Sequence, residues 1–314
     1  MPAPILVTGA SGFIGRHLTR ALADQALPCV PARRHELATQ ADWSGEVRGM
    51  GSVVHLAAAA HEAAQRHERA RNYEPLRRMN ALATEELARA AAAAGVQHFV
   101  FVSSIAVHGD ETTGAPFSET SALAPRSLYG RSKLEAEERL AAVAAQTGLR
   151  ITALRPTLVY GPGNPGNFRR LIRVVQRGWP LPFRAVANRR NLTYVGNLVA
   201  AIVAALRSPA PETFIVCDRE ALSTPQLVRE LAAGLGREPN LFAVAPACLT
   251  AAARITGRRD LARRLVGSLE ADCSKICRVL GWEPPFHAPE GLRETARWHE
   301  AHRTAHAGDA GPSG

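Results

Sequence analysis

The sequence predicts an α/β protein built on a doubly wound parallel sheet with a smaller C-terminal lobe, and three observations lead to this fold class. An apolar segment at residues 4–8 is followed directly by a glycine-rich turn and an amphipathic helix. Alanine-rich helical stretches, such as residues 84–94, alternate with short apolar strands, as expected for a parallel sheet covered by helices. Two further apolar runs, at residues 51–58 and 99–109, have the composition of buried parallel strands.

The glycine-rich turn lies where a Rossmann-type fold binds the pyrophosphate of a dinucleotide. Glycines let the backbone approach the phosphates closely, and the helix that follows offers unpaired N–H groups. A glycine cluster alone is weak evidence, but here both the preceding strand and the following helix are present. We therefore expect a nicotinamide dinucleotide to contact Gly9, Ser11, Gly12, Phe13, Ile14 and Gly15.

The chain length allows two units. With 314 residues, the chain is long enough for a cofactor domain and a substrate lobe. We expect residues 1–163, with strands returning near 190–218, to form mainly the cofactor domain. Residues 164–189 and 219–300 should form mainly the substrate-binding lobe, and residues 303–314 should be a disordered tail.

The net charge of +10 would ordinarily suggest nucleic-acid binding. The basic residues are spread along the chain, however, with few aromatic residues among them for base stacking, so we expect no nucleic-acid partner. A positive potential would also attract a phosphorylated cofactor and a diphosphate substrate. The sequence has no apolar stretch long enough for a bilayer and no signal-peptide pattern, which predicts a cytoplasmic protein without membrane association.

The cysteine pattern argues against a metal site. Five cysteines are scattered along the chain, and only Cys273 and Cys277 are close in sequence, without histidines at metal-ligand spacing. We expect reduced, structural thiols and no bound metal.

Tyr129 and Lys133 are spaced four residues apart, which places both side chains on one face of a helix. A cation beside a phenol would lower the pKa of the phenol and prepare it to exchange a proton with a hydroxyl or a ketone. The spacing alone also fits a packed Tyr and a solvated Lys. Its combination with the glycine-rich turn favours a catalytic pair.

These two motifs together resemble the short-chain dehydrogenase/reductase superfamily. The resemblance implies that Ser104, near the end of the strand at 99–109, binds the reacting oxygen, and that Tyr129 and Lys133 complete the catalytic set. It also implies that Asn80 is a structural asparagine near the active site. The cofactor would additionally lie against strand ends at Leu56, Ala57, Ala58 and Pro156 and contact Tyr129 and Lys133.

The segment 154–163 resembles the extended branch of this superfamily, the epimerase/dehydratase family, which acts on nucleotide sugars. The resemblance extends from Ile5 to about Trp298. It implies that Asn167 and Arg190 contact the diphosphate of a UDP-sugar, with Arg264 as a less certain second arginine. A guanidinium suits this planar, multi-oxygen anion. By analogy with the family, the protein would be a homodimer joined through helices near 77–94 and 128–146.

The choice of cofactor depends on the end of the second predicted strand. An NAD-specific site normally places a carboxylate there, whereas the 2′-phosphate of NADP requires cations. Arg33 and Arg34 stand at this position without an acidic residue. We therefore expect NADP(H), with NAD(H) as the alternative.

The residues that follow Ser104 limit the reaction. Ile105 and Ala106 replace the Asp-Glu pair of the dehydratases, and Ile105 also replaces the cysteine of the epimerase-reductases that make GDP-linked sugars. With these two reaction types disfavoured, the remaining reaction type is hydride transfer at a single sugar carbon. His108 instead of the usual Tyr, the missing acidic residue near Arg33 and the segment Gly196-Asn197 favour a 4-ketoreductase.

Other segments, including residues 180–182 and 266–269, also resemble bacterial reductases of UDP-4-keto-6-deoxy-N-acetylhexosamines, which serve surface polysaccharide synthesis. The sequence thus ranks this reductase first. An NAD-dependent UDP-hexose or UDP-N-acetylhexosamine 4-epimerase is the alternative, and a non-enzymatic NADPH sensor is a remote third.

Overall fold

A computed structural model describes residues 3–33, 42–59, 66–68, 70–256 and 259–307 of the chain. Its centre is a six-stranded sheet with the order β2-β1-β3-β4-β5-β8, in which every neighbouring pair is parallel. The strands of this sheet are β1 (Ile5–Thr8), β2 (Cys29–Pro31), β3 (Ser52–His55), β4 (His98–Val102), β5 (Arg150–Pro156) and β8 (Thr213–Val216). The order reverses between β1 and β3, and this confirms the predicted doubly wound α/β fold.

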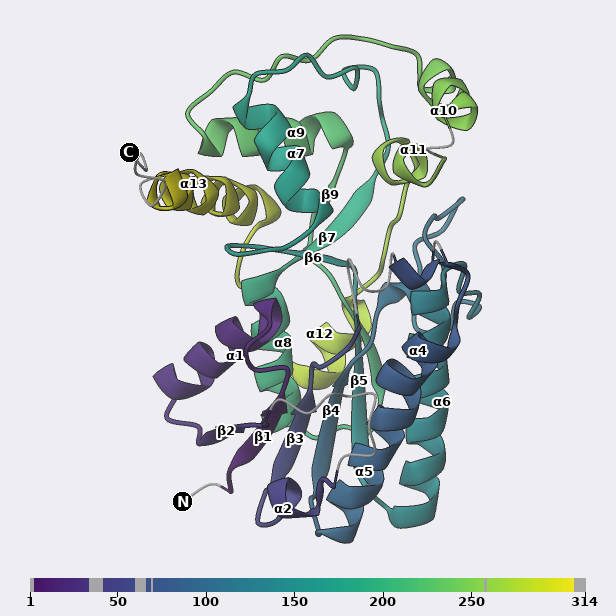
Figure 1. Cartoon of the computed structure of the whole chain (residues 1–314), viewed down its shortest axis with the longest axis vertical. Coiled ribbons are helices and arrows are strands. Elements are labelled where there is room, and N and C mark those ends of the chain that lie inside the picture. Colours follow the sequence, from purple (N-terminus) through teal and green to yellow (C-terminus); the bar gives the residue numbers. More distant parts are fainter. Residues whose placement is uncertain (1–2, 34–41, 60–65, 69, 257–258, 308–314) are drawn as a thin grey trace, which may run out of the picture.

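Helices cover both faces of this sheet (Figure 1). One face packs on α1 (Phe13–Asp24), α8 (Val195–Arg207) and α12 (Ser274–Leu280). The other face packs on α2 (Ser44–Val47), α5 (Ala83–Ala93) and α6 (Leu128–Thr147).

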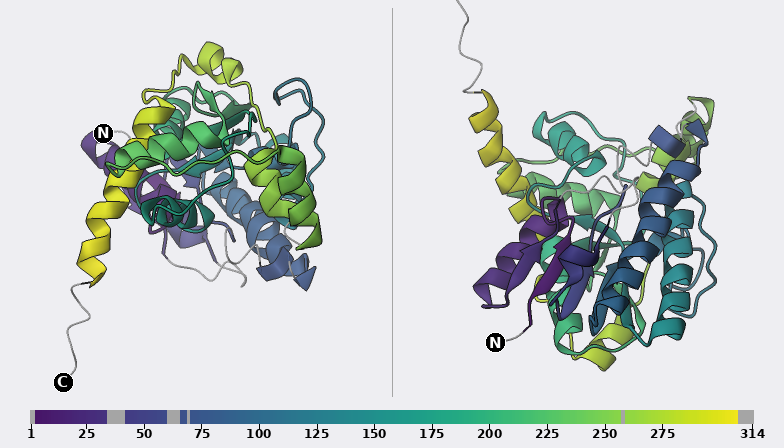
Figure 2. Two further views of the ribbon diagram at one scale, coloured as in Figure 1. Left: turned by 90° about the horizontal axis from the view of Figure 1, so that it is seen from above. Right: turned by 60° about the horizontal axis from the view of Figure 1, so that its bottom comes forward.

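Alternate residues along each strand supply the two cores. Val100 and Val102 of β4 face the first helical layer, and Phe99 and Phe101 face the second. Because both faces are buried, the strands are apolar throughout instead of alternating with polar residues. The helices α5 and α6 lie side by side along the second face (Figures 1 and 2).

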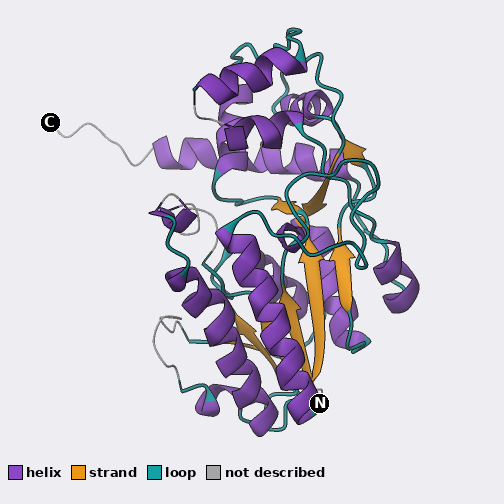
Figure 3. Cartoon of the chain, turned by 90° about the vertical axis from the view of Figure 1, so that its right-hand side faces the viewer, coloured by secondary structure: helices purple, strands orange, loops and turns teal. Residues whose placement is uncertain are grey.

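The remaining elements gather beyond the carboxyl ends of the strands (Figures 1 and 3). They include a small sheet with the order β6-β7-β9 and a separate apolar core between its helices. The elements are β6 (Leu158–Tyr160), α7 (Asn167–Gln176), β7 (Arg190–Tyr194), β9 (Ala221–Leu222), α9 (Thr224–Gly234), α10 (Pro246–Ile255), α11 (Arg259–Val266) and α13 (Ala288–Ala307).

The last helix differs from the expectation for the C-terminus. α13 extends to Ala307, so residues 303–307 are helical, whereas the sequence placed them in a disordered tail. Alanine and arginine are good helix formers, and they outweigh the polar composition that suggested disorder. Residues 308–314 lie outside the described part of the chain. Among the described residues, no helix is both long and apolar enough to cross a bilayer.

Candidate active site at the carboxyl ends of the strands

The glycine-rich turn forms a tight passage from β1 to α1. Gly9 has a φ of 68°, and a Cβ placed on it would lie 2.9 Å from the Ala57 nitrogen. A Cβ on Gly15 would lie 2.1 Å from the Gly9 oxygen. The turn therefore has no room for side chains at Gly9 and Gly15. The first turn of α1 presents its N–H groups beside the turn, as the binding of a pyrophosphate requires.

A series of buried hydrogen bonds between polar side chains lies next to this turn. The Thr84 hydroxyl donates to the Asn80 carbonyl at 2.8 Å, so it accepts a hydrogen bond from His55 Nε2 at 2.9 Å. The Thr8 hydroxyl then donates to His55 Nδ1 at 2.7 Å, while its oxygen accepts the backbone N–H groups of residues 56 and 57 at 3.2 and 3.3 Å. Burial, with a smaller contribution from Lys133, lowers the pKa of His55 to about 3, so the imidazole is neutral.

Sequence reasoning missed this series of hydrogen bonds, because Thr8 and His55 appear only as strand-end residues. Their parallel register pairs them directly across β1 and β3. Ala58 and Pro156, two further residues expected to contact the cofactor, lie just after β3 and at the end of β5.

The start of α6 fixes Tyr129. Ser127 is the N-cap, and its hydroxyl accepts the Gly130 N–H at 3.0 Å. The carboxylate of Glu68 accepts the N–H of Leu128 at 2.7 and 3.0 Å. A carboxylate at a helix N-terminus is also favoured by the helix dipole. Ser127 and Glu68 therefore both fix the helix start that carries Tyr129. Only Ser127 could be recognised from the sequence, because Glu68 is distant along the chain.

The structure places Ser104 near Tyr129. Ser104 lies in extended backbone just after β4, and its side chain is close enough to the Tyr129 phenol to influence the pKa of the phenol. Burial raises the pKa of Tyr129 to about 12, and the Ser104 side chain opposes this rise. Both oxygens are thus placed to contact one reacting group.

Lys133 is fully buried one helical turn from Tyr129. Its Nζ donates to the Val102 carbonyl at 2.9 Å and lies 4.6 Å from the centroid of the Phe101 ring. Burial lowers the pKa of Lys133 to about 7, and the charge of Glu137 opposes this effect. The expected lowering of the pKa of Tyr129 by Lys133 is wrong for this structure, since burial dominates and the ammonium is directed towards β4.

Asn80 lies in a π-helical segment, η1 (Arg78–Leu82), between the short α4 (Glu74–Arg77) and α5. Its Oδ1 accepts the Ala59 N–H at 2.7 Å, and its Nδ2 donates to Ser132 Oγ at 2.9 Å. π-Helical turns often occur at functional sites. Here the turn lets one amide join the end of β3 to the face of α6 that carries the catalytic pair.

A second buried network lies behind Ser104. Arg155 donates from Nε and Nη2 to the Glu137 carboxylate at 3.0 and 2.5 Å, and Ser103 Oγ donates to the same carboxylate. Arg155 Nη1 also donates to His108 Nε2 at 2.9 Å, so His108 Nδ1 carries the proton that is donated to the Ala122 carbonyl at 3.2 Å. Burial, followed by the charge of Arg155, lowers the pKa of His108. His108 thus serves as a neutral acceptor for Arg155.

Two arginines approach each other from β7 and α11. Arg190 Nη1 donates to the Gly267 carbonyl at 2.9 Å. Burial, and then the nearby charge of Arg264, lowers the pKa of Arg190. A pair of neighbouring guanidinium groups is well suited to a polyanion. Asn167 begins α7, but its side chain lies outside the described part of the structure.

The end of β2 differs from its sequence interpretation. The backbone N–H of Arg33 donates to the carboxylate of Glu46, from α2, at 3.2 Å. An acidic side chain therefore reaches this strand end from a segment that is distant in sequence. Arg34 lies outside the described residues.

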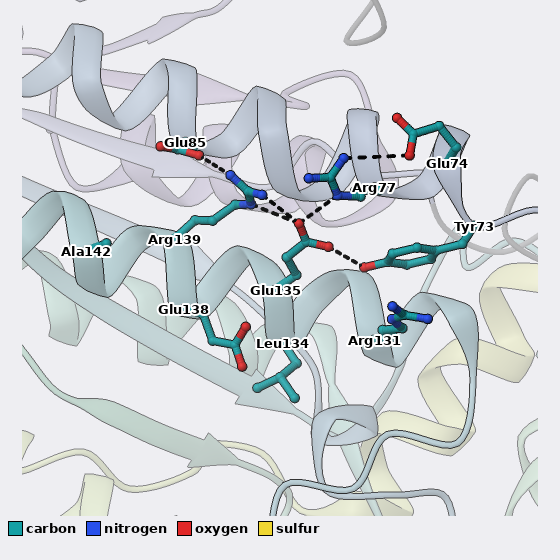
Figure 4. A pocket seen from close by; sticks show the side chains of 10 residues that line it. All are labelled: Tyr73, Glu74, Arg77, Glu85, Arg131, Leu134, Glu135, Glu138, Arg139 and Ala142. Carbon is teal, nitrogen blue, oxygen red and sulfur yellow. Dashed lines mark hydrogen bonds and ion pairs between the residues drawn. The ribbon is translucent and has the colours of Figure 1, made fainter.

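A charged groove is lined by residues of α4, α5 and α6 (Figure 4). Glu135 accepts hydrogen bonds from Tyr73, Arg77 and Arg139 at 2.7–3.0 Å. Arg139 also pairs with Glu85 of α5 at 2.5 Å. These ion pairs join α4, α5 and α6, the helices expected to form a dimer interface.

The chain matches a known protein family and is similar to several named relatives. The model of the NAD dependent epimerase/dehydratase family matches residues 5–217. A UDP-glucose 4-epimerase of Vibrio cholerae is 36% identical, and the alignment covers 95% of both chains. An N-acetyl-α-D-glucosaminyl-diphospho-ditrans,octacis-undecaprenol 4-epimerase of Escherichia coli O157:H7 is 26% identical over 95% of this chain and 96% of the relative.

Solved structures share the fold. A UDP-glucuronic acid 4-epimerase of Bacillus cereus in complex with NAD superposes with a TM-score of 0.77 at 22% identity, covering 95% of this chain and 99% of the other.

Proposed function

Since the chain belongs to the NAD-dependent epimerase/dehydratase family, we propose that it interconverts the C4 epimers of a UDP-linked hexose or N-acetylhexosamine, with NAD held at the glycine turn. The observation that carries this proposal is the relative at 36% identity, which is a UDP-glucose 4-epimerase and aligns over nearly the full length of both proteins. The position of Ser104 near Tyr129 supports chemistry at a single sugar hydroxyl.

This proposal reverses the order that the sequence suggested. The ketoreductase was ranked first on His108, on Gly196-Asn197 and on the missing acid near Arg33. Two of these reasons lose force in the structure: His108 has a structural role as acceptor for Arg155, and Glu46 reaches Arg33 from α2. The relatives favour the epimerase, and the ketoreductase remains as an outcome of the test below.

The proposed proton chemistry uses Tyr129 and Ser104. As the phenolate, the form that Ser104 favours, Tyr129 Oη takes the proton of the C4 hydroxyl as the sugar is oxidised, and the resulting phenol returns this proton when the hydroxyl re-forms. Ser104 Oγ holds the C4 oxygen through both steps, which keeps the oxygen in place while the sugar presents its other face. A nicotinamide bound beside them would accept the C4 hydride and return it.

The remaining site residues would bind and orient the cofactor and the substrate. Lys133 would hold the ribose next to the nicotinamide, and the glycine turn with Leu56 to Ala58 would hold the rest of the cofactor. Arg190 and Arg264, with Asn167, would bind the diphosphate of the substrate. The keto-sugar could then rotate about the bonds that join it to the diphosphate, and so present either face of C4, while the UDP stays anchored.

The cofactor and the reaction can be tested together. The purified protein is extracted with acid, and the released nucleotide is identified as NAD, NADP or neither. The protein is then incubated separately with UDP-glucose and UDP-N-acetylglucosamine, and the C4 epimers are measured by chromatography. A parallel reaction with NADPH and UDP-2-acetamido-2,6-dideoxy-hexos-4-ulose is followed by NADPH absorbance.

Epimer formation without net consumption of NADPH is the expected result. Stoichiometric loss of NADPH, without epimers in the other reactions, would instead establish the ketoreductase. No turnover in any reaction would contradict both enzymatic proposals for these sugars.

A further inference from the structure

Three cysteines meet between the end of β8 and the start of α12. Cys217 directly follows β8, Cys273 directly precedes α12, and Cys277 lies in the first turns of α12. Cys217 belongs to a buried apolar cluster against which Cys273 packs. Cys273 and Cys277 also pack together against the main core of the six-stranded sheet. The sequence brought only two of these cysteines near each other, and the fold adds the third.

Cys273 lies at the centre of this cluster. Its thiol lies near those of Cys217 and Cys277, since each of the two interacts electrostatically with it. The Cys217 thiol donates to the carbonyl of Ala271, two residues before Cys273, at 3.4 Å. Cys273 is partly exposed, whereas Cys217 is buried.

The three thiols differ in their readiness to ionise. The neighbouring Cys217 thiol lowers the pKa of Cys273, whereas the pKa values of Cys217 and Cys277 are raised, by the neighbouring Cys273 and by burial respectively. A thiolate is the form that reacts with peroxides. Cys273 and Cys277 are both partly exposed, and of these two Cys273 is the one more readily ionised.

We propose that Cys273 and Cys217 form a reversible redox site, in which a hydroperoxide oxidises Cys273 and Cys217 then closes a disulfide. The Cys273 thiolate attacks the peroxide, the O–O bond breaks, and sulfenic acid and hydroxide form. The Cys217 sulfur then attacks the sulfenic sulfur, the S–O bond breaks, and the oxygen leaves as water with the thiol proton. A dithiol reductant restores both thiols by disulfide exchange.

Helix geometry favours Cys217 over Cys277 as the partner. Cys277 donates its backbone N–H to the Cys273 carbonyl at 3.4 Å, so the two residues follow helical spacing. Side chains four residues apart on a helix have Cβ atoms about 5–6 Å apart. A disulfide requires about 3.5–4.5 Å. Cys273 and Cys277 could bond only if the start of α12 unwound, whereas Cys217 approaches from another element.

The position of the site links it to the substrate arginines. The segment before Cys273 runs along β7: Asn191 donates its N–H to the Leu269 carbonyl at 3.0 Å, and Arg190 donates to Gly267. A Cys217–Cys273 disulfide would draw this segment towards β8. We expect oxidation to weaken UDP binding severalfold, an expectation that rests on the proposed function.

The test uses the full-length protein, first reduced with dithiothreitol and then exposed to hydrogen peroxide. Alkylated peptides are mapped by mass spectrometry without reduction. A Cys217–Cys273 crosslink that dithiothreitol removes is expected. A crosslink between Cys273 and Cys277 would overturn the assignment of Cys217, and absence of any crosslink at Cys273 would overturn the site.

Variants distinguish the two steps. In Cys217→Ser, which keeps a small hydrogen-bonding side chain, dimedone should trap sulfenic acid on Cys273 after peroxide treatment. Cys248→Ser, which removes an exposed cysteine of α10, should crosslink as the unmodified protein does. Equal dimedone labelling of Cys248 and Cys273 would show that the cluster confers no selectivity and would refute the proposal.

Peptide mapping requires no enzymatic activity. Failure of the redox site can therefore be distinguished from failure of the proposed function. UDP affinity, measured by calorimetry on reduced and oxidised protein, tests the linkage separately. Unchanged affinity in a fully crosslinked sample would disprove the effect on the substrate arginines.

Discussion

Ser104, just after the end of β4, lies near Tyr129 in the first turn of α6 and acts on the pKa of its phenol. Ser104 favours the phenolate that burial disfavours, so the proton balance of Tyr129 depends on a residue from another element.

Tyr129→Phe should reduce epimerase turnover by about 10²-fold or more, because proton transfer by a positioned side chain contributes about 10²–10⁴-fold. NAD content should stay nearly unchanged, since the substitution removes a single oxygen. Tyr73→Phe is the matched control, because Tyr73 hydrogen-bonds Glu135 in the charged groove. Turnover is measured by chromatography of the epimers, and equal activity of the two variants would remove Tyr129 from the mechanism.

Arg190→Gln should weaken UDP binding by about tenfold or more, because a charged hydrogen-bond donor to the diphosphate is lost. Arg189→Gln is the control, since Arg189 is largely exposed and pairs with Glu270 at 2.7 Å. Calorimetric titration with UDP measures both. Similar affinities for the two variants would place the diphosphate elsewhere.

His55 should make the protein sensitive to acid. Its pKa is about 3 in the folded protein and near 6.5 when unfolded, so the unfolded chain binds more protons below pH 6.5. The free energy of unfolding should therefore fall as the pH decreases from about 6.5 towards 3. From pH 7.5 to 5, the free energy of unfolding should fall by about 2 kcal/mol because of His55. The loss begins only near pH 6.5, and each pH unit below this corresponds to about 1.4 kcal/mol.

Urea denaturation of the unmodified protein and of His55→Gln at several pH values measures this effect. The variant should be less stable at pH 7.5 but should lose less stability on acidification. Burial also lowers the pKa values of His98 and His108, but both residues are present in both proteins. The difference between the two slopes of unfolding free energy against pH therefore isolates His55. Parallel slopes would show that His55 does not resist protonation.

Glu137→Gln should destabilise the protein by about 3–5 kcal/mol, because the Arg155 guanidinium would remain buried without its carboxylate. The pKa of Lys133 should also fall further, since the charge of Glu137 is what opposes the effect of burial. Glu138→Gln, at the neighbouring exposed position, should change stability little. Equal denaturation midpoints for the two variants would contradict this account of the network.

The sequence allowed the fold to be predicted, and the positions of the candidate site residues along it, because local signals agree with the tertiary structure. The glycine turn lies between strand and helix, and Tyr129 and Lys133 lie on the helix that Ser127 caps. Predictions that depended on distant contacts were less reliable. Glu46 reaches the end of β2 from another element, and the pKa of Tyr129 follows burial, which spacing does not reveal.

The charged groove of Figure 4 should lie in the interface of a homodimer. A two-fold interface needs a self-complementary surface, and this groove carries both arginines and glutamates around the apolar Leu134 and Ala142. Leu134→Arg should shift the protein from dimer to monomer in sedimentation velocity. Ile255→Arg on α10, at a position that is 86% exposed, should leave the sedimentation coefficient unchanged. A monomeric unmodified protein, or a dimer that tolerates Leu134→Arg, would place any self-association on another face.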